Sequence, residues 1–419
     1  RRHSQTALTR QDGAVRSRHV DVDSVFLKIA DVAAKDTPFH IRTRNNIDLL
    51  TQPGDMFAAL ERDIRGAKQF CHLEFYIIDP QGRVLDILSA VMDAARRGVE
   101  CIILADHIGS KSFFKSHWPQ QLTSAGVRLI DSLPTGLIKS LFLRSDLRNH
   151  RKLVILDRRI GYSGSFNLAD PDYFKIDKGI GKWVDVLLRI EGDSAEAMSV
   201  VFNTDYVLET QENSGLRKIP PLTPLESPPD SMQYDDKPTQ VIPSGPEMNT
   251  SIIYETVVSS IYSAKDCIDI TTPYLIPDES LLLALTNAAR RGVRVRIIVP
   301  AKVDSFLVRH ASRSYFHELL DAGIEILEYQ DGLLHTKIIS IDGSVSYLGT
   351  VNLDMRSFYL NLEVTIALHS REDCRSVSQI IEGYLHACKP VETSDWMDGR
   401  RSKPVIFLEN FIRLTGPLL

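Results

Sequence analysis

Residues 150–157 read HRKLVILD, and residues 335–342 read HTKIISID. Both stretches have the pattern His-x-Lys-x4-Asp, and both continue, at the same distance, into Gly-Ser-Phe-Asn (164–167) or Gly-Thr-Val-Asn (349–352). The chain has 12 histidines, for which average residue frequencies predict only about 0.04 chance matches to the core pattern. Two matches with the same extension therefore indicate one structural unit that occurs twice.

The surroundings of the motif repeat as well. Ala-Ala-Arg-Arg-Gly-Val occupies residues 94–99 and again 288–293, and a second Ala-Gly stretch recurs at 125–129 and 322–326. Apolar residues at helical spacing precede each Ala-Ala-Arg-Arg, and a short apolar run after each Gly-Val predicts a buried strand. This alternation predicts an α/β fold of two similar domains, each with a mixed, largely parallel sheet flanked by helices.

A proline-rich segment separates the two copies. Eight of the 20 prolines lie between residues 220 and 246, which predicts an extended linker. The chain is too long for one ordinary core, and we expect five parts: a basic N-terminal segment (1–20), a first domain (21–212), the linker (213–239), a second domain (240–400) and an apolar and basic tail (401–419).

The spacing within each motif places its side chains. Residues 152–156 and 337–341 are predicted strands, and side chains two residues apart on a strand share one face. His150 and Lys152 therefore point together, as do His335 and Lys337. The aspartates that complete the two catalytic motifs, Asp157 and Asp342, lie at the strand ends, and Asp-Gly is a hairpin-turn signature. We expect both aspartates to be structural rather than proton-transfer groups.

Paired histidines and lysines of this kind suit attack on a phosphodiester. One neutral histidine can serve as the nucleophile and form a phosphohistidine, while the other protonates the departing alcohol and later deprotonates the incoming one. The lysines offset charge on the non-bridging oxygens. The hydroxyls and amides that follow the motifs are predicted to donate to phosphate oxygens, namely those of Ser165, Asn167, Thr350 and Asn352. No metal or other cofactor is expected.

Each histidine also needs a partner for its second ring nitrogen. Asp185 lies 35 residues after His150, and Glu363 lies 28 residues after His335, each in a predicted strand. The longer loop in the first copy accounts for the difference. We predict that these two acids orient the histidines.

Composition limits the function. The formal net charge of −5 and the pI of about 6.2 disfavour a basic nucleic-acid binder. The five cysteines form no Cys-x-x-Cys pair, so neither a zinc site nor a disulfide framework is indicated.

At its motifs the chain resembles the bacterial cardiolipin synthases of the phospholipase D superfamily. The resemblance covers the chain from about residue 40 onward, and it rests on DLRNHRK (146–152), NLADP (167–171), GLLHTK (332–337), NLDMRS (352–357) and EFYI (74–77). It implies two halves related by a pseudo-two-fold axis with both motifs at their interface, His150 as the nucleophile, His335 as the acid and base, and a supporting role for Glu74.

The resemblance also implies a reaction and a location. The expected substrate is phosphatidylglycerol, from which a phosphatidyl group passes to a second phosphatidylglycerol with release of glycerol. The expected location is the bacterial cytoplasmic membrane, with the catalytic domains at its surface. The family usually carries two membrane-spanning helices before the catalytic region, whereas no stretch of about 20 apolar residues occurs here; loss of those helices and peripheral binding both stay open.

Other acceptors stay open too. Water would make a phospholipase D and serine a phosphatidylserine synthase, while a nuclease or a non-catalytic lipid-binding protein fits the composition or the intact motifs less well. The oligomeric state is not indicated. Two segments are candidates for contact with lipid: an insertion of about a dozen residues before the first motif, including LIKSLFL (137–143), and the tail (405–414), which we expect to dock on the second domain.

Overall fold

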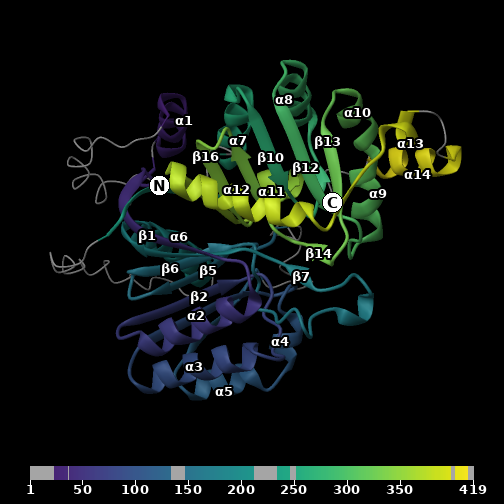
Figure 1. Cartoon of the computed structure of the whole chain (residues 1–419). Helices are drawn as coiled ribbons and strands as arrows, with labels where there is room; N and C mark the ends of the chain where they lie inside the picture. Colours follow the sequence, from purple (N-terminus) through teal and green to yellow (C-terminus); the bar gives the residue numbers. More distant parts are fainter. Residues whose placement is uncertain are drawn as a thin grey trace.

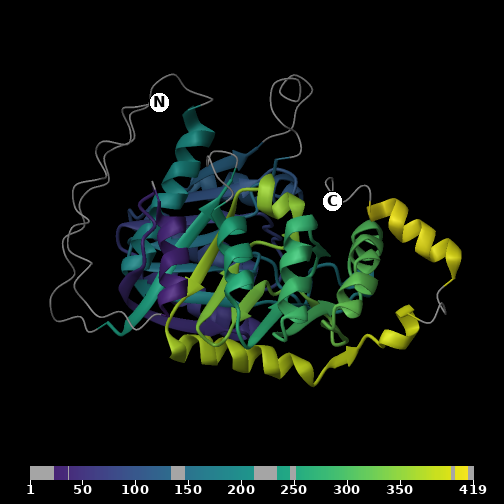
Figure 2. The same ribbon diagram turned by 90° about the horizontal axis from the view of Figure 1, so that it is seen from above.

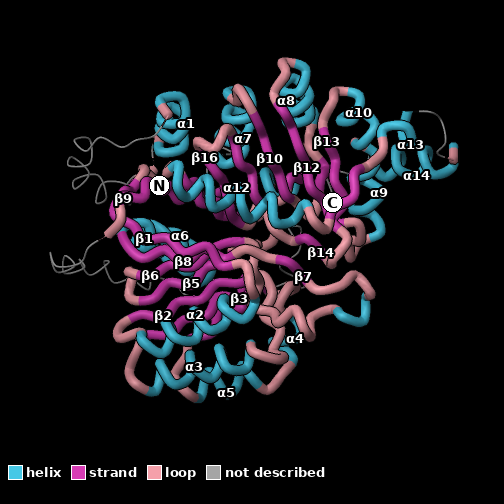
Figure 3. Tube along the Cα trace, viewed as in Figure 1, coloured by secondary structure: helices cyan, strands magenta, loops and turns pink. Residues whose placement is uncertain are grey.

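The computed structural model describes residues 23–35, 37–133, 147–211, 234–245, 252–397 and 402–413. One sheet of 15 strands runs through both halves of the described chain (Figures 1 and 3). Its first-half strands are β1 (Arg42–Leu50), β2 (Phe70–Phe75), β3 (Glu100–Asp106), β4 (Arg128–Ser132), β5 (Lys152–Leu156), β6 (Ile160–Gly164) and β8 (Leu187–Gly192). Its second-half strands are β9 (Asp236–Ser244), β10 (Cys267–Thr271), β12 (Arg294–Pro300), β13 (Glu325–Tyr329), β15 (Ile338–Ile341), β16 (Val345–Gly349), β18 (Glu363–Leu368) and β19 (Cys388–Pro390).

The strand order shows the internal repeat directly. From the centre outward, the first half runs β1-β8-β6-β5-β2-β3-β4 and the second runs β9-β18-β16-β15-β10-β12-β13, with β19 at the far edge. The halves join where β1 pairs antiparallel with β9. The predicted duplication and the mixed α/β fold are thus confirmed.

The expectation of a largely parallel sheet was wrong. Within the described sheet, only β2-β3-β4 and β10-β12-β13 run parallel. The other neighbours are antiparallel because each motif strand turns back at once into a hairpin, as β5–β6 and β15–β16. Two short parallel pairs lie outside this sheet: β7 (Trp183–Val184) with β14 (Leu333–Leu334), and β11 (Leu275–Ile276) with β17 (Leu353–Asp354).

Helices cover the sheet and form a core between the halves. The outer layer comprises α2 (Pro53–Gly66), α3 (Val84–Arg96), α4 (Lys111–Lys115) and α5 (Trp118–Ser124) on the first half, and α7 (Ile252–Ser263), α8 (Glu279–Arg290), α9 (Phe306–Ser314) and α10 (Phe316–Asp321) on the second. Apolar side chains of α6 (Asp193–Gln211) and α12 (Arg371–Leu385) pack with residues of β5, β8, β15 and β18 in one shared core. Because this core draws on both halves, it fixes their relative position.

Two terminal helices pack on the second half. α1 (Ser24–Ala34) contributes Phe26 and Ile29 to the core around α7, although its residues fall within the predicted first domain. The short helix α13 (Thr393–Met397) is followed by α14 (Lys403–Arg413), which lies against α9 with Ile412 buried, so the tail does contact the second half. Strand β9 begins at Asp236, within the segment predicted as a linker.

The motif aspartates close the hairpins. Asp157 and Asp342 have positive φ values of 52° and 53°, as residues in a tight hairpin turn do. The Asp157 carboxylate accepts backbone N–H groups of residues 68–70 at the start of β2, at 2.7–3.2 Å. Asp342 does the same for residues 265–267 at the start of β10. These contacts support the structural role predicted for both residues.

We expect Asp157→Ala to lower the free energy of unfolding by about 2 kcal/mol, because it leaves backbone N–H groups without their acceptor. Asp157→Asn is the control, since asparagine keeps one acceptor oxygen and tolerates positive φ. Urea unfolding would measure the loss. An Asp157→Ala protein that kept its stability but lost its turnover would contradict the structural role.

Candidate active site

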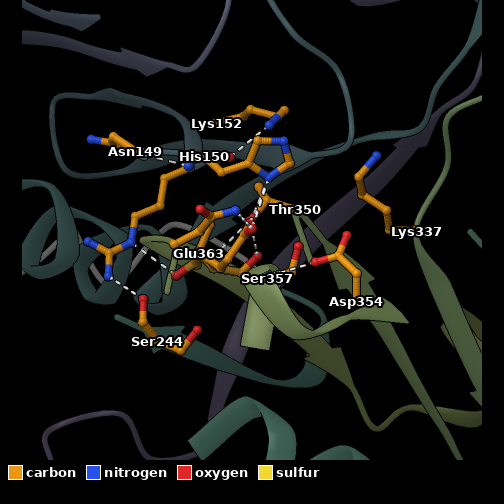
Figure 4. A network of polar contacts seen from close by, with 12 residues as sticks. Asn149, His150, Lys152, Ser244, Lys337, Thr350, Asp354, Ser357 and Glu363 are labelled. Atoms are coloured by element: carbon orange, nitrogen blue, oxygen red, sulfur yellow. Dashed lines mark hydrogen bonds and ion pairs between the residues drawn. The ribbon is translucent and has the colours of Figure 1, made fainter. Parts of the chain in front are cut away.

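The first motif places its histidine at the start of β5, against the other half of the molecule. His150 is buried, and its Nδ1 lies 2.9 Å from Oε2 and 3.0 Å from Oε1 of Glu363 on β18 (Figure 4). Glu363 also accepts from the Thr350 hydroxyl and from Asn361 Nδ2. This carboxylate fixes the tautomer and leaves Nε2 of His150 free of the proton that Nδ1 carries.

The second motif repeats the arrangement with the roles of the halves exchanged. His335 Nδ1 lies 2.7 Å from Oδ1 of Asp185, which comes from the first half. Asp185 in turn accepts from the Ser165 hydroxyl at 2.6 Å. The two predicted acids thus contact the histidines, but each one contacts the histidine of the other copy.

Backbone hydrogen bonds explain this crossing. His150 N donates to Leu362 O at 3.0 Å, and the residue after Leu362 is Glu363. Equivalently, His335 N donates to Val184 O at 2.8 Å, and the next residue is Asp185. Because the segments ahead of each histidine and each acid run side by side, the side chains that follow meet across the boundary.

Two predicted phosphate donors have a different role in the structure. Ser165 and Thr350 donate to the carboxylates of Asp185 and Glu363, and each hydroxyl also accepts the backbone N–H of the residue after that acid. Their expected donation to phosphate was therefore wrong. The reason is strand pairing: Gly164 at the end of β6 pairs with Leu187, two residues after Asp185, and Gly349 at the end of β16 pairs with Thr365, two residues after Glu363, which turns both hydroxyls toward the carboxylates.

The lysines are buried and hold altered pKa values. Lys152 Nζ donates to His150 O at 2.7 Å, and Lys337 Nζ donates to His335 O at 2.6 Å. Burial lowers the pKa of Lys152 to about 8. Burial, reinforced by the charge of Lys152, lowers the pKa of Lys337 to about 7. Asp185 and Glu363 act in the opposite direction on both lysine pKa values but do not offset the effect of burial, so each ammonium group would be stabilised by an added anion.

The histidines are held neutral. Burial lowers the pKa of each to about 4 against the opposing pull of its carboxylate. Burial acts to raise the pKa of Glu363 and of Asp185, but the charged neighbours and hydrogen bonds outweigh it, so both pKa values lie below the usual range. Neutral imidazoles beside ionised acids are available as nucleophile and base.

Both histidines open onto one cavity of about 510 Å³ between the halves. Its lining contains Asn167 and Asn352, the two asparagines whose amides are predicted to donate to phosphate. The His150 ring lies edge-on to Tyr76, with centroids 5.1 Å apart, and the His335 ring lies 4.3 Å from that of Trp183. These aromatic walls hold the imidazoles in place and keep part of the cavity apolar.

Sequence reasoning missed several charged groups of this cavity. Lys175, which pairs with Asp304 at 2.8 Å, lines it, as do Arg148, Asp354 and Arg356. Burial raises the pKa of Asp354 to about 6. Arg148, Asp354 and Arg356 lie within the stretches that carried the family resemblance, which was the available signal for them.

Arg151, the residue between His150 and Lys152, supports the backbone of the site. Arg151 forms a buried ion pair with Asp205, and its guanidinium donates to the carbonyl oxygens of Glu363 (3.0 Å) and Ser244 (2.9 Å). It thereby fixes the backbone of the acid that contacts His150. The available signal for this role was a charged residue directly ahead of the strand 152–156.

Glu74 lies behind the site. It accepts from Asn149 Nδ2 at 2.7 Å, and burial raises its pKa well above the usual value. It is not among the described residues that line the cavity, so any effect on substrate passes through the neighbouring chain at Asn149. Among the described residues, no group of three or more His, Cys, Asp or Glu side chains is placed to hold a metal ion.

A duplicated α/β fold with two crossed His–acid pairs that open onto one cavity, each histidine backed by a buried lysine two residues further along the chain, defines a phospholipase D-type enzyme. The family model described as "Cardiolipin synthase, PLD-like domain" matches residues 60–177 and 257–385. Cardiolipin synthase A of Erwinia tasmaniensis is 42% identical over 357 residues, covering 84% of this chain and 71% of that protein. The Proteus mirabilis protein of the same name is 40% identical with the same coverage. The chain belongs to the cardiolipin synthase family of phosphatidyltransferases.

Solved structures support the fold. The crystal structure of phosphatidylserine synthase from Haemophilus influenzae aligns with a TM-score of 0.67 at 12% identity, covering 93% of this chain and all of that one. Polyphosphate kinase from Porphyromonas gingivalis aligns with a TM-score of 0.56 at 13% identity, over 88% of this chain and 53% of that one. At such identities the likeness concerns the fold alone.

Two findings concern the membrane-related expectations. None of the described helices combines the length and the apolar character that crossing a membrane requires. The apolar insertion (137–143) lies outside the described residues.

We expect kcat/KM to fall as pH rises through about 7 to 8. The lysine pKa values are lowered to about 8 for Lys152 and about 7 for Lys337, so the charged, anion-binding forms exist below these values and are lost above them. His150, the expected nucleophile, stays neutral above about pH 4 and imposes no loss in this range.

A pH–rate profile with short-chain phosphatidylglycerol would measure this effect. Lys337→Arg is the matched variant, because a guanidinium stays charged and should remove the lower of the two ionisations. A profile that stayed flat to about pH 9, where an ordinary lysine is still charged, would contradict the assignment.

Proposed function

We propose that this enzyme transfers a phosphatidyl group from phosphatidylglycerol to the hydroxyl of a second phosphatidylglycerol, giving cardiolipin and glycerol. The observation that carries the proposal is the pair of neutral histidines that open onto one cavity, each bonded through Nδ1 to an acid of the other half. A buried lysine donates to the carbonyl oxygen of each histidine. Family membership supports the lipid substrate.

In the first half-reaction, Nε2 of His150 attacks the phosphorus of the donor lipid. The P–O bond to glycerol breaks as the P–N bond forms, and Glu363 stabilises the positive charge that develops on the imidazole. His335 protonates the departing glycerol oxygen. The bound phosphodiester anion favours the protonated form of His335 relative to the empty cavity, because a nearby negative charge raises a histidine pKa.

In the second half-reaction, the free hydroxyl of another phosphatidylglycerol attacks the phosphohistidine. His335, neutral after the first step, takes the proton of that hydroxyl, and the P–N bond breaks to regenerate His150. Lys152, Lys337 and the amides of Asn167 and Asn352 offset the charge on the non-bridging oxygens in both steps. The site needs no cofactor for this sequence.

His150 is the proposed nucleophile on the family resemblance and on the support of its acid. Glu363 accepts from a hydroxyl and an amide, and Arg151 holds its backbone carbonyl, whereas Asp185 accepts from the Ser165 hydroxyl and His335. Glu363 is therefore held by more contacts than Asp185, and a firmly held acid fixes the orientation of its histidine for in-line attack. This favours His150 as the nucleophile. The proposed partners are phosphatidylglycerol and a bacterial cytoplasmic membrane surface, with no role for nucleic acid.

Purified enzyme given phosphatidylglycerol vesicles should produce cardiolipin and glycerol in equal amounts, followed by mass spectrometry. Vesicles without phosphatidylglycerol are the control. Phosphatidic acid as the sole lipid product would show that water, rather than a lipid, is the acceptor. The absence of product from every phospholipid tested would overturn the proposed function.

The histidine roles can be separated with an activated donor whose leaving group is p-nitrophenol. His150→Ala and His335→Ala should each lower turnover of phosphatidylglycerol by at least about 1000-fold, with the fold retained in circular dichroism. Because p-nitrophenol leaves without a proton, His335→Ala should still form the phosphohistidine from this donor, whereas His150→Ala should not. Labelling found on His335 in the His150→Ala protein would reverse the assignment.

A further inference from the structure

Exposed apolar side chains lie on the segments that line the catalytic cavity. Ile108, which lines the cavity, is 47% exposed, and Phe306 at the start of α9 is 64% exposed. The other members of this set, the rim, are Tyr173, Ile176 and Leu307. Large apolar side chains that cluster at the surface of a protein mark a site of contact with another molecule or a membrane.

Contacts between the halves hold the rim in place. Lys175, between Tyr173 and Ile176 in the chain, lines the cavity and pairs with Asp304 at 2.8 Å. Asp304 and Val308, on either side of Phe306 and Leu307, also line the cavity. Segments from both halves therefore present their apolar residues around one opening.

Helix α14 extends the rim. It packs on α9 through the buried Ile412 and leaves Phe407 73% exposed and Phe411 59% exposed, with their rings stacked 6.5 Å apart. Figures 1 and 2 show α14 at the outer edge of the molecule beside α9. The helix is thus docked by one side while it presents aromatic residues on the other.

Positive charges accompany these apolar residues. Exposed basic residues lie on the same segments: Lys111 and Lys115 on α4, close after Ile108; Lys178 beside Ile176; and Lys302 and Arg309 around Phe306. Of the nearby acids, Asp172 and Asp304 are paired with Lys182 and Lys175, whereas the exposed Asp177 lies beside Lys178. Apolar residues with flanking cations match the surface of an anionic bilayer, with its apolar interior and negative headgroups.

We propose that the rim and the outer side of α14 dock on a bilayer rich in anionic phospholipid, with the cavity mouth facing the headgroups. The proposal rests on the proposed function, because two lipid substrates must bring their phosphates to the histidines while their acyl chains stay in an apolar medium. A mouth surrounded by apolar residues lets the chains remain in the bilayer as the headgroups enter.

Vesicle co-sedimentation tests this placement with two double variants. Phe306→Ser with Leu307→Ser alters the rim, and Phe407→Ser with Phe411→Ser alters α14. Each should weaken binding to phosphatidylglycerol vesicles by roughly tenfold or more, because two apolar side chains no longer enter the bilayer. The matched control is Leu208→Ser with Leu283→Ser, two exposed leucines on α6 and α8, which should bind as the unaltered enzyme does.

Turnover of a short-chain phosphatidylglycerol in solution should be unchanged in all three double variants, which separates docking from chemistry. Vesicle binding is measured in the His150→Ala background as well, so a failure of the proposed reaction leaves the docking result readable. Unchanged vesicle binding in both altered proteins would overturn the proposal. So would a shift from dimer to monomer in sedimentation velocity with vesicle binding unchanged, because the surface would then bind a second copy.

Discussion

The hydrogen bonds that run between the halves ahead of each histidine are the constraint on which the active site depends. His150 N binds the carbonyl oxygen of Leu362, and His335 N binds that of Val184. Each bond fixes the register of a histidine against the acid that follows its partner residue. These bonds therefore determine which carboxylate contacts each imidazole. Each catalytic pair requires both halves.

Close backbone approach makes this register possible. Gly332 has a φ of 133°, and a Cβ at this position would lie 2.3 Å from the carbonyl oxygen of Lys182. Only glycine accommodates both the positive φ and this distance. The shared core of α6 and α12 then holds the halves together over a larger area. The geometry of the site thus depends on a local backbone contact and on a core shared by both halves.

Burial determines the electrostatics of the cavity. Removing the histidines and lysines from water disfavours their charged forms, and the acids restore only part of that loss for the histidines. The outcome is a pair of neutral imidazoles, and two buried lysines whose charged forms an incoming phosphodiester can stabilise. Burial of the acids is tolerated because hydroxyl and imidazole donors satisfy them, through Ser165 at Asp185 and Thr350 at Glu363.

Local spacing in the sequence determined the duplication, the motif strands, the shared face of each histidine and lysine, and the turn at each motif aspartate, because strand parity and turn chemistry depend on neighbouring residues. It also identified Asp185 and Glu363 as the acids. Only the tertiary structure decided that the acids cross between the halves and that Ser165 turns away from the cavity, since both depend on which distant strands pair. The antiparallel majority of the sheet and the apolar rim arise in the same way, from segments that long stretches of chain separate.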